Sequence, residues 1–130
     1  MRRQFDLPES DLLYLGGTGL DWETIIERNQ QWLLIHDRPT HDGYRPSTAT
    51  TAIRIVPGYP DSPLDMVWFH PGLVASNGKQ IKALSNTQID GCQYQRWSRH
   101  RTPANAWRPG LDDLAGHLVL VDYWLEREVA

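Results

Sequence analysis

The chain has 130 residues, a formal net charge of −3 at pH 7 and a single cysteine. This length fits one domain with a hydrophobic core and is too short for two, and the weakly acidic balance gives no electrostatic basis for bulk binding to nucleic acid or to a membrane surface. One cysteine excludes an internal disulfide framework and favours a reducing cytoplasm, and no apolar run approaches the length of a membrane span. We therefore expect one soluble, cytoplasmic domain over residues 1–130.

The first predicted element is a short helix near the N-terminus. Asp6 is suited to capping its start and Pro8 to its first turn, while Gly16-Gly17 is suited to ending it. The helix would then have about two turns. Its inward-facing residues would be Leu12, Leu13 and Leu15.

A series of strands is predicted next. Stretches rich in β-branched, aromatic and other apolar residues occur at Trp22–Arg28, Trp32–His36, Thr48–Val56 and Leu64–Phe69. The polar or proline-containing connections between them are short, which predicts a four-stranded antiparallel meander. Residues with metal-binding side chains occur in this region at His36, Asp37, His41 and Asp42. They have no recognised metal spacing, so no metal site is predicted.

The regular pattern ends after His70. Residues 73–93 contain scattered apolar residues, two asparagines and two glycines. We expect this segment to be irregular, apart from one short helical turn near residues 82–84. Because it has few apolar anchors, we also expect residues 73–90 to be the least ordered internal part of the chain.

The last segment is predicted as a helix over residues 111–126. Asp112 and Asp113 complement the positive end of a helix dipole. Apolar residues recur at helical spacing at Leu111, Leu114, Leu118, Val121 and Leu125. This stripe should pack against one face of the sheet.

Three motifs resemble the ubiquitin-conjugating-enzyme (UBC) family. The first is Gly-Tyr-Pro-x-x-Pro at 58–63, followed by a strand and His-Pro-Gly at 70–72; the others are Gln-Arg-Trp-Ser-Arg-His at 95–100 and Trp-Arg-Pro-Gly-x-Asp-Asp-Leu at 107–114. More narrowly, the chain is similar to the small bacterial UBC-like proteins called prokaryotic family E. The resemblance implies an α+β fold with a short N-terminal helix, a four-stranded antiparallel meander, an irregular active-site loop and a C-terminal helix. It also predicts a cis peptide bond at Tyr59-Pro60.

The resemblance implies a conjugating activity. Such a protein accepts a ubiquitin-like protein from an activating enzyme as a cysteine thioester and transfers it to an amine. The implied partners are a ubiquitin-like protein, including a multi-ubiquitin one, a ThiF-like activating enzyme and a JAB-type peptidase of the same pathway. No metal or organic cofactor is implied, because the activating enzyme consumes the nucleotide.

Cys92 is the candidate nucleophile, because it is the only thiol in the chain. The spacing usual in the family predicts a cysteine near Lys82, whereas Cys92 lies twenty residues beyond Gly72. Two explanations stay open. Either an insertion displaces the nucleophile to Cys92, or Cys92 is incidental.

Two histidines complete the candidate catalytic set. In the family the histidine at the position of His70 holds the turn, and His100 is a candidate general base, since imidazole titrates near neutrality. Gly72 stands where the family has an asparagine. Backbone donors, or the amides of Asn77 or Asn86, could replace that asparagine at a developing oxyanion.

The remaining candidate residues are basic, aromatic or acidic. Ser98, Asp112 and Asp113 are supporting candidates, the two aspartates as partners for nearby arginines. Arg2, Arg3, Trp97 and Arg99 are candidate partner-binding residues. Two other functions stay open: a catalytically inactive UBC-like scaffold that binds a ubiquitin-like protein, and an RNA-binding module that uses Trp97, Arg99, Arg101 and Trp107.

Overall fold

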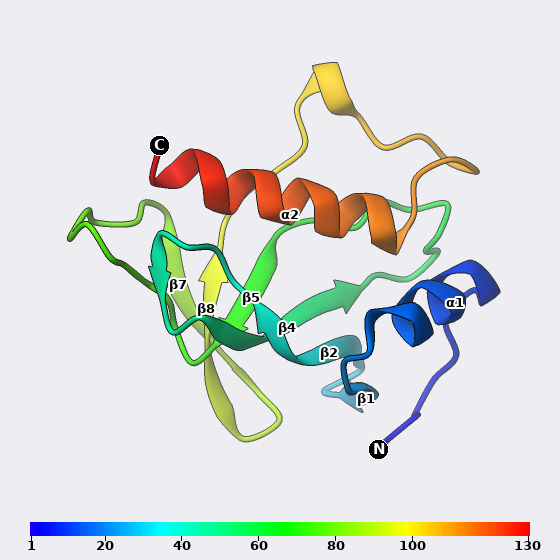
Figure 1. Ribbon diagram of the computed structural model, residues 1–130. Coiled ribbons are helices and arrows are strands. Elements are labelled where there is room, and N and C mark those ends of the chain that lie inside the picture. The colour runs from blue at the N-terminus through cyan, green and yellow to red at the C-terminus, as the bar shows by residue number, and fades with distance from the viewer.

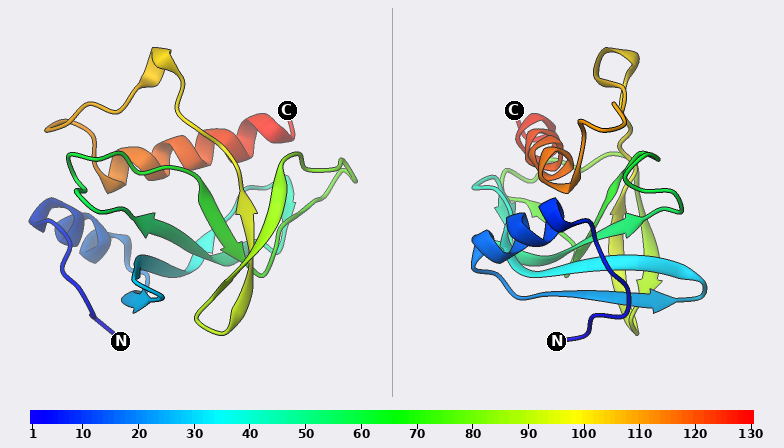
Figure 2. Two further views of the ribbon diagram at one scale, coloured as in Figure 1. Left: turned by 180° about the vertical axis from the view of Figure 1, so that it is seen from behind. Right: turned by 90° about the vertical axis from the view of Figure 1, so that its right-hand side faces the viewer.

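A six-stranded antiparallel sheet forms the body of the molecule (Figure 1), and the computed structural model describes residues 1–130. In chain order the elements are α1 (Glu9–Thr18), β1 (Trp22–Glu27), β2 (Gln30–Pro39), β3 (Tyr44–Arg45), β4 (Thr48–Ile55), β5 (Val67–His70), β6 (Val74–Ala75), β7 (Leu84–Ile89), β8 (Cys92–Trp97), a 3₁₀-helix η1 (Pro103–Asn105) and α2 (Leu114–Glu128). The strand order is β1-β2-β4-β5-β8-β7, and β3 and β6 form a separate two-stranded sheet. α2 lies across one face of the large sheet, as Figures 1 and 2 show.

The predicted α+β architecture is confirmed, and the predicted meander is formed by β1, β2, β4 and β5. Each of these strands pairs antiparallel with the next one. The Tyr59-Pro60 peptide bond is cis, as predicted. The last strand of the meander begins at Val67 rather than at Leu64, because the segment before it stays in the proline-rich loop.

The expectation for residues 73–93 is correct for residues 76–83, which form no helix or strand, and wrong for the rest. Instead of an irregular segment with a helical turn, this region contains β6, β7 and the start of β8, and all six residues of β7 pair with β8. The connecting turn is Asp90-Gly91, with φ of 53° and 74°, the positive φ values for which Asp-Gly is favoured in a two-residue hairpin. β7 was not predicted because its sequence, Leu-Ser-Asn-Thr-Gln-Ile, is mostly polar. Backbone pairing along the whole of β7 contradicts the expected low order for residues 84–89.

Both helices begin later than expected. α1 begins at Glu9 and continues through Gly16-Gly17 to a left-handed residue, Gly19, with φ of 73°. Its inward residues are Asp11 and Leu15, one turn apart, while Leu12 and Leu13 are exposed. This corrects the predicted inward face, because a helix packed on one side buries a narrow stripe.

α2 begins at Leu114 after Asp113, whose carboxylate accepts a hydrogen bond from Gly116 N. The side chain of Leu111 is 71% exposed and belongs to the preceding turn, which corrects the predicted start. The rest of the predicted stripe is buried: Leu114, Leu118, Val121 and Leu125. Neither helix has the length and apolar character needed to cross a membrane.

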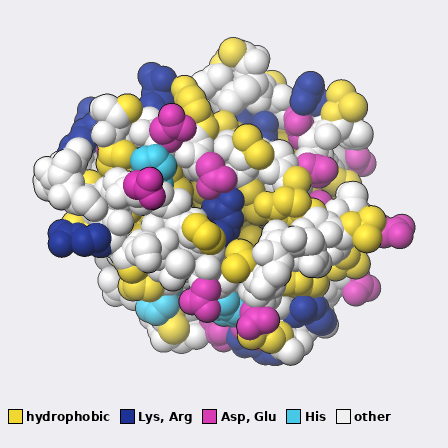
Figure 3. Space-filling view, in the orientation of Figure 1, with side chains coloured by type: hydrophobic (Ala, Val, Ile, Leu, Met, Phe, Trp, Pro, Cys, Tyr) yellow, Lys and Arg dark blue, Asp and Glu magenta, His cyan; other side chains and the backbone are white.

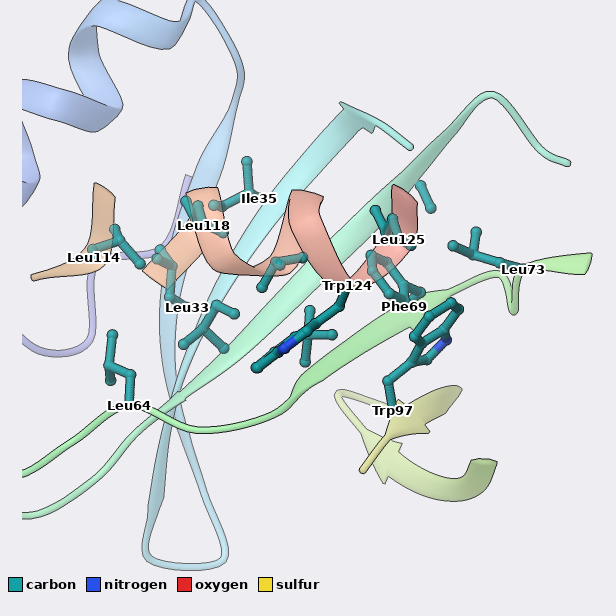
Figure 4. Close-up of a cluster of buried hydrophobic side chains, with 14 of the residues drawn as sticks. Leu33, Ile35, Leu64, Phe69, Leu73, Trp97, Leu114, Leu118, Trp124 and Leu125 are labelled. Carbon is teal, nitrogen blue, oxygen red and sulfur yellow. The ribbon is translucent and has the colours of Figure 1, made fainter. Parts of the chain in front are cut away.

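The sheet is apolar on both faces. The face under α2 belongs to a cluster of twenty buried residues, and the opposite face belongs to a cluster of seven: Ile25, Trp32, Leu34, Ala52, Trp68, Ile89 and Tyr94. Trp97 is fully buried in the larger cluster, with its ring centroid 5.6 Å from that of Phe69 and 5.7 Å from that of Tyr44. Figure 4 shows Trp97 below Phe69, near Trp124 and Leu125 of α2.

An ion-pair cluster joins the N-terminus to the sheet. Arg2 lies 2.9 Å from a carboxylate oxygen of Glu23 and 2.6 Å from one of Asp90. Glu23 also lies 2.8 Å from His36 Nε2. Hydrogen bonds from Arg2, and then from His36, lower the pKa of Glu23 to about 2.

Replacing Glu23 by Gln is expected to reduce the loss of stability in acid. A carboxyl group whose pKa is lower in the folded state stabilises the fold above its unfolded pKa of 4.5 and loses that contribution as the pH falls toward 2. Urea unfolding at pH 6 and at pH 3 measures the difference. The exposed Glu126→Gln variant is the control and should follow the wild type. Equal acid sensitivity in both variants would contradict the assignment.

Candidate functional site

The first and third motifs meet beside the start of α2. The hydroxyl of Tyr59 donates to Asp11 Oδ2 at 2.5 Å, and Leu114 N donates to Asp11 Oδ1 at 3.4 Å. Trp107 donates from Nε1 to Pro60 O at 3.0 Å and packs against the ring of Tyr59. Burial raises the pKa of the Asp11 carboxyl. These contacts hold Trp107 and the start of α2 against the Tyr59-Pro60 loop.

The Tyr59→Phe variant is expected to lose about 1–3 kcal/mol of unfolding free energy, because it leaves a buried carboxylate oxygen without its donor. Thermal and urea unfolding measure the loss. Tyr14→Phe is the matched control, because the hydroxyl of Tyr14 makes no hydrogen bond within the chain. If the two variants lost the same stability, the bond to Asp11 would not be the cause.

The His70–Gly72 turn packs on β8. Nδ1 of His70 lies 2.9 Å from Gln93 O, and the His70 ring lies beside the ring of Tyr94. Leu73 N and O both bond to the side-chain amide of Gln95. A Cβ at Gly72 would lie 3.2 Å from Gln95 Nε2, so this position has little room for the amide side chain that the family carries.

Cys92 is the first residue of β8, directly after the Asp90-Gly91 turn. Its side chain is half-buried and packs against the smaller apolar cluster, on the same face as Tyr94. Burial raises the pKa of Tyr94, and charges on Cys92, Asp90 and Glu23 raise it further.

The β7–β8 hairpin separates Cys92 from Lys82. Cys92 and Trp97 lie at opposite ends of β8, roughly 17 Å apart at about 3.3 Å per residue. Leu84 pairs with Trp97, so Lys82 lies at the Trp97 end. The length of the hairpin therefore separates the thiol from Lys82, the residue near which the family spacing predicts a cysteine.

His100 also lies at the Trp97 end of β8. It is 63% exposed, and its Nδ1 lies 2.7 Å from Asp65 Oδ2. His100 is a candidate general base for a Cys92 thioester, but it lies at the opposite end of β8 from Cys92. Of the other two predicted catalytic residues, His70 contacts Gln93 and Tyr94, and Cys92 lies on the sheet face of Tyr94.

A surface hollow of about 700 Å³ lies at the Lys82 end, between α2 and the two segments 79–82 and 99–105. We call it the Lys82 hollow. Its lining is Lys79, Lys82, Arg99, His100, Thr102, Ala104, Asn105, Leu120, Tyr123, Trp124, Arg127 and Glu128. This volume falls within the range of about 300–1,000 Å³ that is typical of ligand sites.

Glu128 organises the Lys82 hollow from the end of α2. Its carboxylate accepts from Lys82 N at 3.1 Å and pairs with Arg99 at 3.1 Å. Arg99 also donates to Lys82 O at 3.0 Å, and its guanidinium lies over the ring of Trp97. Lys79 Nζ donates to the backbone oxygen of Glu128 at 2.6 Å. These bonds fix segment 79–82 against α2.

The Lys82 hollow has more cations than anions. Its one carboxylate, Glu128, is neutralised by Arg99. Arg127 donates to the Tyr123 hydroxyl, and Lys82 makes its hydrogen bonds through its backbone alone. The ammonium groups of Lys79 and Lys82 and the guanidinium of Arg127 therefore have no carboxylate partner. Such a site can bind an anionic group such as a carboxylate.

The other predicted residues lie outside this hollow or take part in local contacts. The side chain of Asn77 accepts a hydrogen bond from Lys79 N, and Asn86 is exposed on β7. Ser98 N donates to Ala83 O, and Asp113 caps α2. The guanidinium of Arg3 lies over the ring of Trp22. Asp112 pairs with Arg108, whose hydrogen bond lowers the pKa of Asp112. Arg2 is engaged by Glu23 and Asp90.

The prediction that Trp97 binds a partner is wrong. Trp97 is fully buried, so it cannot contact a partner, and the RNA-binding hypothesis loses its first stacking residue. Arg99 packs on that buried ring and pairs with Glu128. Figure 3 shows acidic and basic side chains interspersed on the face that it draws, with no continuous basic surface there.

Sequence reasoning missed most of the Lys82 hollow. The family spacing pointed to Lys82, but not to Lys79, Tyr123, Arg127 or Glu128. The last three lie on α2, more than forty positions away in the sequence. No local pattern links them to segment 79–82.

Comparison with known proteins gives one match. The model of the family described as Prokaryotic E2 family E matches residues 7–128. No curated protein and no solved structure matches the chain. The matched range contains all three motifs, the β7–β8 hairpin and the Lys82 hollow.

Proposed function

The chain belongs to prokaryotic E2 family E, and we propose that it binds a ubiquitin-like protein non-covalently, with the C-terminal carboxylate of that modifier in the Lys82 hollow. The proposal rests on one observation. Lys82, near which the family spacing predicts a cysteine, lies in a hollow whose cations have no carboxylate partner, while the only thiol lies at the far end of a hairpin.

The chemistry of the Lys82 hollow suits a free carboxylate. A carboxyl terminus that is joined to a thiol as a thioester has lost its negative charge, whereas an unactivated terminus keeps it. Hydrogen bonds that involve an ionised group contribute about 1.5–3 kcal/mol each. The site would therefore prefer the unactivated modifier. The ThiF-like activating enzyme and the JAB-type peptidase would act on the same modifier in the pathway.

A second candidate function is thioester transfer through Cys92. It is favoured by the half-exposed position of Cys92 on the sheet face that also contains Tyr94 and His70. The activating enzyme would transfer the modifier to this thiol, and an amine would then attack the thioester. The separation of Cys92 from Lys82 and His100 along β8 weighs against it.

A loading reaction separates the two candidates. The chain is incubated with the ubiquitin-like protein, the activating enzyme and ATP, and the products are run on a non-reducing gel. The first proposal predicts no thiol-sensitive adduct. It also predicts ATP-independent binding of the modifier, measured by calorimetry, that is equal for the wild type and Cys92→Ala.

The opposite pattern would support the second candidate. It would consist of an adduct that thiols cleave, that is lost in Cys92→Ala and that becomes a more stable oxyester in Cys92→Ser. Absence of both adduct and binding would reject both candidates.

A further inference from the structure

The two edges of the large sheet differ in how their backbone groups are satisfied. The outer edge of β1 is covered by the N-terminal segment: Thr24 N donates to Arg2 O, Gln4 N to Thr24 O, and Ile26 N to the side chain of Gln4. β7 forms the other edge. No segment of the chain pairs with its outer side, and Figure 2 shows the β7–β8 hairpin extending away from α2.

The register of the hairpin identifies the free groups of β7. The pair Ile89–Cys92 closes a two-residue turn and is therefore a hydrogen-bonded pair, and such pairs alternate along the ladder. Ile89, Thr87 and Ser85 thus bond to β8, and the bond from Ser98 N to Ala83 O continues the alternation. The N–H and C=O groups of Leu84, Asn86 and Gln88 face outward without partners.

β7 has none of the usual protections of an edge strand. Its sequence, Leu-Ser-Asn-Thr-Gln-Ile, contains no charged residue and no proline, and its pairing with β8 shows no bulge. Its two ends differ in charge. Lys82 precedes its start, and directly after its end Asp90 lies with Glu23 and Glu27 around a single arginine, Arg2, so that end has more carboxylates than guanidinium groups. An antiparallel copy of β7 would place each end of the strand next to the oppositely charged end of its partner.

We propose that β7 is the interface of a two-fold symmetric dimer, in which a second copy of this chain continues the sheet. The outward-facing residues fix the register: Asn86 lies opposite Asn86 of the second copy, and Leu84 lies opposite Gln88. All six free backbone groups of each strand are then paired. The basic end of each β7 then lies next to the carboxylate-rich end of the other. The interface is isologous, so it closes at two copies.

The proposal does not depend on the proposed function, because the backbone of β7 carries it. The test therefore changes Asn86 rather than the cations of the Lys82 hollow. Sedimentation or light scattering over a range of concentrations should show a monomer–dimer equilibrium for the full chain. Asn86→Lys should be monomeric, because the two new ammonium groups would face each other across the two-fold axis.

A matched variant controls for the added charge. Gln93→Lys makes the same charge change at an exposed position of β8, away from the edge, and should dimerise like the wild type. Circular dichroism should give the same melting temperature for Asn86→Lys and Gln93→Lys. A chain that is monomeric at every concentration, or a dimer that Asn86→Lys does not weaken, would overturn the proposal.

Cross-linking tests the register. In a Cys92→Ser background, Asn86→Cys should form an intermolecular disulfide on mild oxidation, because opposed Cα atoms in a hydrogen-bonded pair lie about 5.5 Å apart, within disulfide range. Gln88→Cys should not, because the two copies of residue 88 would be about 13 Å apart along the strands. Cross-linking of Gln88→Cys in preference to Asn86→Cys would reject this register.

Discussion

Lys82→Glu is expected to weaken binding of the free ubiquitin-like protein at least tenfold. The change removes a cation that has no carboxylate partner in the structure, and it adds an anion beside Glu128. One charge-assisted hydrogen bond contributes about 1.5–3 kcal/mol, which corresponds to roughly 10- to 150-fold in affinity. Calorimetry at low salt, where screening is weak, measures the difference.

Two controls make this result specific. Arg54→Glu reverses a charge on β4, beside a different hollow near Tyr59, and should leave the affinity within about twofold, because its charge lies outside the Lys82 hollow. A modifier with an amidated C-terminus lacks the carboxylate, so it should bind weakly to the wild type and be little affected by Lys82→Glu. Equal binding of the free and amidated modifiers would contradict a role for the hollow in recognising the carboxylate.

Trp97→Ala is expected to cost about 3–5 kcal/mol of unfolding free energy, the usual cost of removing a large buried aromatic side chain. Trp97 is fully buried against Phe69 and Tyr44, and its Nε1 donates to Gln95 Oε1 at 2.8 Å. The melting temperature should fall by on the order of 10–20 °C. The cavity would open beneath α2, and the guanidinium of Arg99 would lose the ring on which it lies.

Tyr123→Ala is the control for this prediction, because Tyr123 is half exposed on α2. It should change the melting temperature by only a few degrees. Trp97→Phe keeps an aromatic ring in the core, so its melting temperature should lie between those of Trp97→Ala and Tyr123→Ala. A Trp97→Ala variant as stable as Tyr123→Ala would show that Trp97 is not a central core residue.

The local pattern of the sequence was enough to predict most of the fold. The β-branched and aromatic runs gave β1, β2, β4 and β5 in an antiparallel meander, because alternation and short connections act over neighbouring residues. The spacing of Leu114, Leu118, Val121 and Leu125 gave α2 and its buried face. β7 was missed because its pairing with β8, rather than apolar composition, makes it a strand.

The sequence by itself determined the fold class, the family motifs and the presence of a single thiol. Only the tertiary structure decided where that thiol lies relative to Lys82 and His100, because a hairpin of ordinary length moves its turn well away from the start of its first strand. It also decided that Trp97 is buried and that Glu128 binds segment 79–82. Those contacts join residues more than twenty-five positions apart, and their energy comes from packing and hydrogen bonds that local periodicity does not encode.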